Sequence, residues 1–320
     1  MKYVIGVEDG MTKYAIKAMD LEGRTLAEKS RGAINRKIVG EKKAERLVSE
    51  VTKALLNEFG AKIEDCKCVV VGSVGIDSSG DLLVVESFYA ALGFPCPIFC
   101  MNDGKVALYG ATGGVGVVAI SSAGSIVVGR NETGKITRSG GYPLAIMGNE
   151  GSAQWLAVMA LKHMSRWVDE SVPTTKLVQN MIEHFHGFDS NKLIKCANSL
   201  RRNLIKPEIA SLVYSAAIDG DEAAVDILRK GARELVNVSR EVVQKLEFDK
   251  ESAFVCGMWG SVFYDSAIFA IEYRRLFLQE YPNSSLVCPQ VDGADSAAQM
   301  ALDYLGGEIP FITELEENNK

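Results

Sequence analysis

The hydrophobic pattern at the start of the chain predicts two strands joined by a tight turn. Residues 3–7 form a short apolar run, residues 8–12 have the composition of a turn, and residues 14–20 alternate well enough to form a second strand. Another turn is expected at residues 21–24. No apolar segment with a cleavage site precedes the first strand, so nothing marks the chain for export and we expect a cytoplasmic protein.

The following residues alternate between helix and strand. Apolar residues recur at helical spacing over residues 40–59, and Gly60 stands where a C-cap glycine would end that helix. Buried strands are predicted at residues 68–71 and 98–101, with a helix at residues 81–92 between them. This order is typical of an α/β domain.

A second strand–turn–strand unit begins near the middle of the chain. Strands are predicted at residues 115–121 and 125–130, separated by a short turn of small residues and followed by a hairpin turn at residues 131–134. Residues 152–246 are almost wholly helical in pattern. The last predicted elements are two strands and one helix, at residues 254–256, 286–288 and 295–305. The opening of the chain is therefore repeated.

Length supports two domains. The chain has 320 residues, of which 47% are hydrophobic and 24% are charged, as in an ordinary globular protein. A single core is near its upper size limit at this length, so we expect two domains and a ligand in the cleft between them. We place the first at residues 1–105, joined by residues 306–320, and the second, with a helical insertion, at residues 106–305. No low-complexity linker separates them, which favours a hinge.

Charge and cysteine content narrow the possible partners. The formal net charge of −6 argues against nucleic acid or an anionic membrane, because those partners require clustered Lys and Arg. The longest apolar stretch, residues 115–128, is too short to span a bilayer, which needs about 20 residues. Seven cysteines without a C-x-x-C pair are expected to be reduced thiols. A small-molecule ligand is therefore favoured.

The two predicted turns have the chemistry of a phosphate site. Small residues in a short turn let successive backbone N–H groups converge on one anion. Carboxylates stand beside these elements: Glu8 and Asp9 at the first turn, and Asp103 at the end of a strand. Phosphoryl transfer combines a phosphate cradle, carboxylates that position magnesium and a carboxylate that accepts the hydroxyl proton.

Taken in order, these segments resemble the N-acetylglucosamine kinase branch of the BadF/BadG/BcrA/BcrD ATPase family, within the actin, sugar-kinase and heat-shock chaperone superfamily. The resemblance covers most of the chain. It rests on six segments. They are the first phosphate loop (Gly6–Lys13), the catalytic aspartate position (Asn102–Asp103), the second phosphate loop (Val118–Ser125), two sugar-side segments (Gly140–Tyr142 and Gly148–Ala153) and the adenosine loop (Gly257–Ser261). Asn35 is similar in position to a family residue that hydrogen-bonds the sugar.

The resemblance implies an α/β chain of two actin-like ATPase domains, related to ribonuclease H, which flank a central cleft for nucleotide and sugar. It implies a kinase that uses ATP and Mg²⁺ to phosphorylate a hydroxyl of an amino sugar of the glucosamine or N-acetylglucosamine type. It also implies a homodimer whose partner is a small sugar, with no nucleic acid or membrane.

The resemblance also implies roles for single residues. Asp103 would be the general base, and Glu8 and Asp9 would serve the magnesium ion, either directly or through water. ATP and its phosphates would be bound by Gly10, Thr12, Lys13, Ser122, Ala123, Gly124, Ser125, Gly257, Gly260 and Ser261. The sugar would be bound by Asn35, Asn102, Asp103, Gly141, Tyr142, Asn149, Glu150 and Ala153.

Five positions depart from the family pattern. Asp9 and Met11 stand where the first loop has glycines, so side chains are expected where phosphates need bare backbone. Ser122–Ala123 replaces Gly–Thr, which removes a hydroxyl, and Asn149 replaces an aspartate. These departures leave open a second reading, a sensor that binds sugar or nucleotide without turnover. A third reading is an iron–sulfur ATPase activator, but only Cys256–Gly257 resembles its cysteine loops, and such a cluster needs four thiolates.

Overall fold

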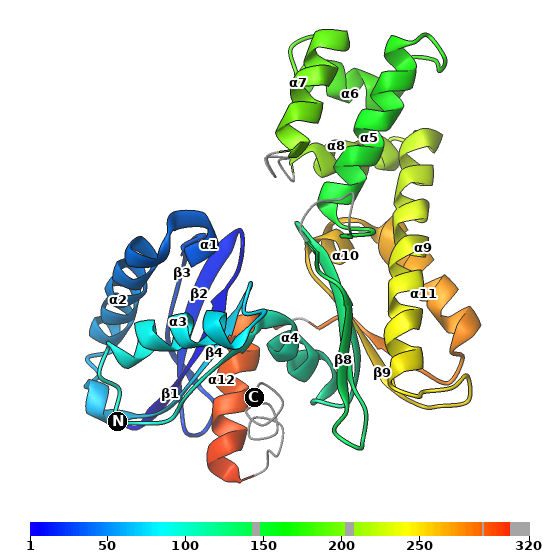
Figure 1. Cartoon of the computed structure of the whole chain (residues 1–320). Helices are drawn as coiled ribbons and strands as arrows, with labels where there is room; N and C mark the ends of the chain where they lie inside the picture. The colour runs from blue at the N-terminus through cyan, green and yellow to red at the C-terminus, as the bar shows by residue number, and fades with distance from the viewer. Residues whose placement is uncertain (143–147, 202–207, 290, 308–320) are drawn as a thin grey trace. The chain divides into compact units, whose positions relative to one another are not determined.

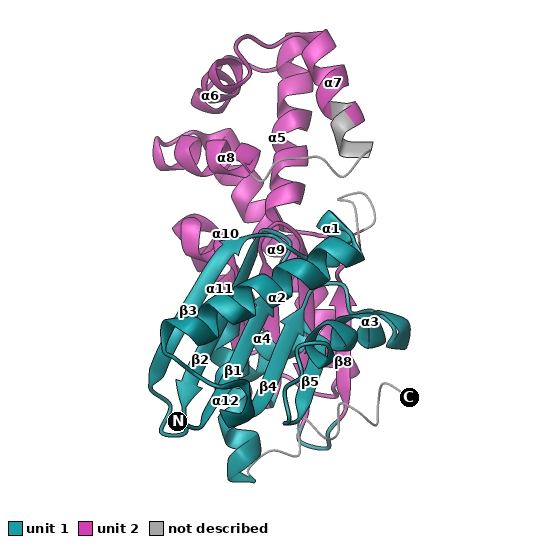
Figure 2. Ribbon diagram, turned by 90° about the vertical axis from the view of Figure 1, so that its left-hand side faces the viewer, with its two compact units in different colours: residues 1–115, 132–134, 289–320 teal, residues 116–131, 135–288 magenta. Residues whose placement is uncertain are grey.

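The computed structural model describes residues 1–142, 148–201, 208–289 and 291–307 (Figure 1). The chain forms two compact units, shown in different colours in Figure 2. Unit 1 comprises residues 1–115, 132–134 and 289–320, and unit 2 comprises residues 116–131 and 135–288.

Unit 1 is built on a five-stranded mixed sheet. In chain order the strands are β1 (Tyr3–Asp9), β2 (Lys13–Asp20), β3 (Thr25–Gly32), β4 (Cys66–Ser73) and β5 (Ile98–Asn102). Their order across the sheet is β3-β2-β1-β4-β5, with β1, β2 and β3 antiparallel and β4 and β5 parallel to β1. The apolar run of β4 is buried throughout most of its length, as expected for a strand covered on both faces.

Helices cover both faces of this sheet. They are α1 (Arg36–Val39), α2 (Glu41–Glu58), the 3₁₀ turn η1 (Ile63–Asp65), α3 (Ser79–Ala90), α4 (Asp103–Thr112) and α12 (Gly293–Gly306). Ile5 and Val7 share a core with apolar residues of α2 and α3, which lie across one face of the sheet (Figure 2). On the other face Gly6 lets α12 approach closely, because a Cβ there would lie 2.2 Å from the Ala294 carbonyl oxygen.

Unit 2 repeats this sheet. Its strands are β6 (Gly116–Ser121), β7 (Ser125–Arg130), β8 (Ile136–Gly140), β9 (Val255–Trp259) and β10 (Ser285–Val287). They are ordered β10-β9-β6-β7-β8, so β6, β7 and β8 correspond to β1, β2 and β3, and β9 and β10 to β4 and β5. The repeat predicted from the sequence is confirmed.

Most helices of unit 2 lie between strands β8 and β9 in the sequence. The helices are α5 (Ala153–Val168), α6 (Lys176–His184), α7 (Ser190–Arg201), α8 (Glu208–Ile218), α9 (Glu222–Lys245), α10 (Ser261–Asp265) and α11 (Ala267–Glu280). The first five confirm the helical pattern predicted for residues 152–246. Together with the sheet they enclose a core of aliphatic and aromatic side chains, including Leu156, Leu235 and Phe269.

The division into units differs from the expected one in two places. Unit 1 extends to residue 115 rather than 105, because α4 packs against β4 and α12. The last helix, expected in the second domain, lies in unit 1 against β1 and β4. An amphipathic pattern predicts a helix but does not say which of two similar sheets it covers. Most of the terminal segment 306–320 lies outside the described residues.

None of the described helices combines the length and the apolar content required to cross a membrane.

Candidate functional site

The first predicted phosphate turn joins β1 to β2. Gly10 N donates to the Lys13 carbonyl oxygen at 2.9 Å and closes the turn, while the Thr12 carbonyl oxygen accepts from Ala33 N at 3.2 Å. Among the described residues, the backbone N–H groups of Met11 and Thr12 have no hydrogen-bond partner. Met11, Thr12 and Lys13 are exposed. The turn therefore presents two backbone donors to solvent.

The departures from glycine do not strain this turn. Neither Asp9 nor Met11 has a positive φ, so the backbone there is one that any residue adopts. The Met11 side chain is 44% exposed rather than folded over the turn. The side chains of these two residues are therefore accommodated without strain in the backbone of the turn.

Glu8 and Asp9 point to opposite faces of the unit 1 sheet, because side chains alternate along a strand. Glu8 faces α12, where a Cβ on Gly293 would lie 2.9 Å from Glu8 Cγ. Asp9 faces the other side, where its Oδ2 accepts from Ser73 Oγ at 2.7 Å and from Asn35 Nδ2 at 3.0 Å. The two carboxylates therefore have different surroundings, and their role at magnesium stays a prediction.

Asp9 and Asn35 form a buried polar network. Burial raises the pKa of Asp9 to about 6, although hydrogen bonds from Ser73 and Asn35 favour its charged form. Asn35 is only 1% exposed. Its Oδ1 accepts from Lys37 N at 3.0 Å and caps α1, and its Nδ2 also donates to the Val74 carbonyl oxygen at 3.1 Å. In this structure Asn35 is committed to these contacts, and its sugar-binding role stays a prediction.

Asp103 is the first residue of α4, directly after β5. Asn102 caps this helix, with its Oδ1 accepting from Gly104 N at 3.0 Å, so the predicted sugar contact of Asn102 is here a helix cap. Burial and the neighbouring Glu8 raise the pKa of Asp103 to about 7, against the lowering effect of backbone N–H groups at the helix start. A carboxyl with this pKa has the proton affinity of a general base near neutral pH.

Asp292, a charged residue that sequence reasoning missed, lies beside the first turn. Lys13 Nζ lies 3.1 Å from Asp292 Oδ2 and 3.6 Å from Glu8 Oε2. Burial raises the pKa of Glu8, although Lys13 opposes this shift. Asp292 begins α12 in a capping box with Asp295. That box is readable in the sequence as two acidic residues three apart, but only the packing of α12 on β1 brings it to the turn.

The second predicted phosphate turn joins β6 to β7 in unit 2. Ser122 N donates to the Gly124 carbonyl oxygen at 2.8 Å, and the carbonyl oxygens of Ser122 and Ala123 accept from Ala153 N and Gln154 N at 2.8 and 3.2 Å. In a planar trans peptide the N–H points opposite to the C=O. The N–H groups of Ala123 and Gly124 therefore point away from the start of α5, and neither has a partner among the described residues.

The predicted adenosine loop lies beside this turn. Gly257 pairs with Val118 of β6 in the parallel ladder. Gly260 has a φ of 104°, and a Cβ there would lie 2.4 Å from the Ser121 carbonyl oxygen. Only glycine satisfies both constraints. Ser261 begins α10, so the start of this helix directly follows the glycine that packs on Ser121.

The predicted sugar-side residues of unit 2 fall into two groups. Gly141 N donates to the Ser125 carbonyl oxygen at 2.9 Å, and Tyr142 is 56% exposed. Glu150 is half-buried, whereas Asn149 and Ala153 are buried. Tyr142 and Glu150 therefore keep side chains available to a ligand, while the buried pair contributes to the second turn.

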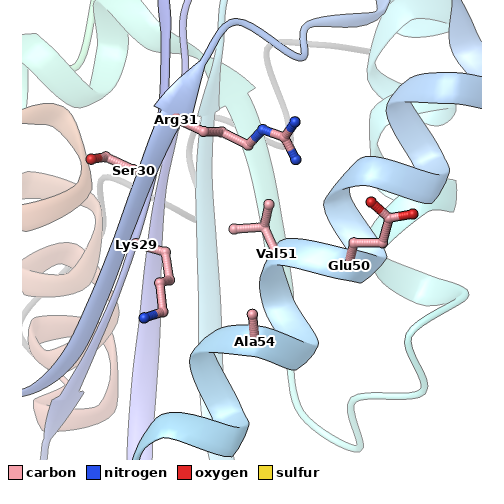
Figure 3. A pocket seen from close by; sticks show the side chains of 6 residues that line it. All are labelled: Lys29, Ser30, Arg31, Glu50, Val51 and Ala54. Atoms are coloured by element: carbon pink, nitrogen blue, oxygen red, sulfur yellow. The ribbon is translucent and has the colours of Figure 1, made fainter.

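A separate pocket lies in unit 1 between β3 and α2 (Figure 3). Its volume of about 210 Å³ is below the roughly 300 Å³ of small ligand sites. It is lined by Lys29, Ser30, Arg31, Glu50, Val51 and Ala54. None of these belongs to the predicted site, so the pocket adds nothing to it.

Comparison with known proteins identifies the family of this chain. Residues 5–301 match the model of the BadF/BadG/BcrA/BcrD ATPase family. The N-acetylmuramic acid/N-acetylglucosamine kinase of Clostridium acetobutylicum is 30% identical over 308 residues, which cover 94% of this chain and 98% of that protein. The N-acetyl-D-glucosamine kinase of Dictyostelium discoideum is 30% identical over 311 residues, which cover 93% and 97%.

A solved structure shows the same fold. It is a protein from Chromobacterium violaceum assigned as an N-acetylglucosamine kinase, with a TM-score of 0.74 and 24% identity, covering 94% of this chain and 99% of that one. The predicted fold class of actin-like sugar kinases is confirmed. The chain belongs to the BadF/BadG/BcrA/BcrD ATPase family.

Proposed function

We propose that this chain is an ATP-dependent kinase that phosphorylates a hydroxyl of an amino sugar of the glucosamine or N-acetylglucosamine type. The two curated relatives, which match over almost their whole lengths, are both amino-sugar kinases. Family membership accounts for ATP as the phosphoryl donor. The structure supplies residues suited to each part of such a reaction.

The observation that carries the proposal is the position of Asp103. Its carboxyl follows β5 at the start of α4, and its raised pKa of about 7 suits removal of a proton from a sugar hydroxyl. As the oxygen attacks the γ-phosphorus of ATP, its proton passes to the Asp103 carboxylate, and the bond from phosphorus to the β,γ-bridging oxygen breaks. The products are the sugar phosphate and ADP.

Phosphate binding is assigned to the paired turns. The free N–H groups of Met11 and Thr12 in unit 1, and of Ala123 and Gly124 in unit 2, are donors of the kind that converge on phosphate oxygens. Lys13 adds a positive charge, and its ion pairs with acidic neighbours hold it at the first turn. Gly257, Gly260 and Ser261 would face adenosine.

Magnesium would be held by Glu8. Its buried Oε2 accepts no hydrogen bond from the described residues and lies 3.6 Å from Lys13 Nζ, so a cation or its water would bind this oxygen in place of Lys13. Mg²⁺ binds through one or two carboxylates plus substrate phosphates, so a single carboxylate is enough for this role. The ion would neutralise charge on the transferred phosphoryl group.

Sugar contacts are proposed for Tyr142 and Glu150, whose side chains remain accessible, with Gly141 placing Tyr142. Asn35 and Asn102 would act on the sugar only if their present hydrogen bonds change. We also propose a homodimer in the cytoplasm, to be checked by light scattering and cell fractionation.

An iron–sulfur activator is not favoured. Cys256 is fully buried in the core of unit 2, with its Sγ 3.6 Å from the hydroxyl of Tyr273. A thiol enclosed in this way cannot help to bridge two subunits through a shared cluster.

The decisive experiment is ADP release from ATP and magnesium by the purified chain, with glucose, glucosamine, N-acetylglucosamine, N-acetylmuramic acid or no sugar. Release that depends on an amino sugar supports the proposal and identifies the substrate. No release with any sugar, combined with thermal stabilisation by a ligand, would replace the kinase by a binding sensor.

A further inference from the structure

Residues 149–154 of unit 2 are bonded to the second predicted phosphate turn by side chains as well as by backbone. Ser121 Oγ donates to the Gly151 carbonyl oxygen at 2.9 Å, and Ser125 Oγ donates to the Glu150 carbonyl oxygen at 2.8 Å. Both serines are almost fully buried. These bonds add to the two backbone bonds that the start of α5 makes to the turn. The turn and residues 149–154 therefore form a single hydrogen-bonded piece of unit 2.

Asn149 is the central residue of this piece. Its Oδ1 accepts from Ser125 N at 3.0 Å, and its Nδ2 donates to Gln154 Oε1 at 3.3 Å. Its side chain is packed against the turn, because a Cβ on Gly124 would lie 2.9 Å from Asn149 Oδ1. The residue is 7% exposed. Both ends of the amide are thus engaged by the turn and by α5, rather than presented to a ligand.

The backbone of Asn149 explains why this residue type is suited to the position. Its φ of 64° lies in the left-handed region, which asparagine tolerates better than most residues. An amide also supplies the acceptor that Ser125 N requires without placing a negative charge beside a turn that binds phosphate.

We propose that Asn149 is a positioning residue of the second phosphate turn and not a ligand of the sugar. By fixing Ser125 N and packing on Gly124, it holds the turn so that the N–H groups of Ala123 and Gly124 are directed at phosphate. This proposal rests on the proposed function, because the kinase reading is what identifies the ligand of the turn as a nucleotide phosphate. It assigns to Asn149 an effect on nucleotide affinity and no direct effect on sugar affinity.

The test compares nucleotide binding with sugar use. Asn149→Gly removes the side chain but keeps a residue that adopts the left-handed backbone, so it isolates the amide. The Kd of ADP, measured by calorimetry on the full chain, is expected to rise about tenfold, as for loss of one buried hydrogen bond that leaves a donor unpaired. The KM for the sugar at saturating ATP is expected to change less than twofold.

A second variant tests the hydrogen bonds between the second turn and residues 149–154 at another residue. Ser121→Ala removes the bond to Gly151 and is expected to weaken ADP binding about threefold, again without changing the KM for the sugar. Ser239→Ala is the matched control, because Ser239 is a fully buried serine of unit 2 that bonds the Leu235 carbonyl oxygen. It is expected to leave the Kd of ADP unchanged. Circular dichroism establishes that each variant is folded.

A rise in the KM for the sugar in Asn149→Gly, with an unchanged Kd of ADP, would overturn the proposal and return Asn149 to the sugar site. So would a Kd of ADP that changes as much in Ser239→Ala as in Ser121→Ala. A wild-type chain that binds ADP but shows no sugar-dependent turnover would overturn the kinase function alone. A wild-type chain that binds no ADP would overturn both.

Discussion

The two phosphate turns occupy equivalent places in two sheets of the same topology, yet they are held in different ways. The first turn, between β1 and β2, is exposed and is closed by a single backbone bond, from Gly10 N to the Lys13 carbonyl oxygen. The second, between β6 and β7, is bonded to residues 149–154 and has Gly260 packed against its beginning. A repeated fold therefore does not imply equal tolerance of substitution. Side chains are accommodated at the first turn, whereas the second turn is closely packed against neighbouring residues and leaves little room for added atoms.

The largest effect on turnover is expected from Asp103→Asn, at the end of the first sheet. Loss of the base should lower kcat by roughly 10²–10⁴-fold in sugar-dependent ADP release. Near-normal turnover in this variant would remove Asp103 from the role of base.

The same variant should be more stable than the wild type at alkaline pH. The pKa of Asp103 is raised from 3.8 to about 7, so the folded chain holds the proton more tightly than the unfolded chain. Stability from this group is fully present below about pH 4 and is lost as pH rises through 7. Because Asn carries no charge, Tm should be higher in Asp103→Asn at pH 8, and the difference should shrink at pH 5. A lower Tm at pH 8 would contradict the assigned cause of the shift.

The contrast between the turns is tested next by glycine substitution. Gly260→Ala combines a left-handed φ with a Cβ that would lie 2.4 Å from a backbone oxygen, so it should destabilise the fold by roughly 2–4 kcal/mol. Gly220→Ala is the matched control, because Gly220 has a φ of 83° with open space around it. It should cost only about 1–2 kcal/mol. Equal losses in urea unfolding would show that crowding at the second turn is unimportant.

The pH dependence of the wild type gives a further test of the first sheet. At pH values well below 7, where Asp103 is mostly protonated, kcat/KM should fall about tenfold for each unit by which the pH decreases. The pKa of Asp9, raised to about 6, should steepen the fall if its buried network must stay ionised. A rate that is constant from pH 8 to 5.5 would be incompatible with Asp103 as the base.

The smallest effect is expected from Met11→Gly in the first turn. Met11 has an ordinary φ and an exposed side chain, so restoring the family's glycine should change kcat/KM for ATP by less than about threefold. Thermal unfolding should show a small loss of stability, because glycine adds freedom to the unfolded chain. A large gain in ATP turnover would show that Met11 obstructs the phosphates after all.

The comparison also separates what could be predicted from what could not. The repeated strand–turn–strand pattern, the helical block before residue 246 and the positions of Gly10, Gly124 and Asp103 were all readable, because strand periodicity and turn composition are local properties. The surroundings of Glu8 and Asp9 differ although the two are adjacent in the sequence, because a strand sends adjacent side chains to opposite faces of its sheet.

The sequence by itself determined the fold class, the repeat, the family and the residue types available for phosphoryl transfer. Tertiary structure alone decided that α12 packs on the first sheet and carries Asp292 to Lys13. It also decided that the amides of Asn35 and Asn149 form hydrogen bonds with neighbouring backbone and side-chain atoms. The physical reason is the distance along the chain over which each kind of interaction acts. Periodicity and turn chemistry act over a few residues, whereas the partners of a buried polar group are set by segments that meet only when the sheets and helices have packed.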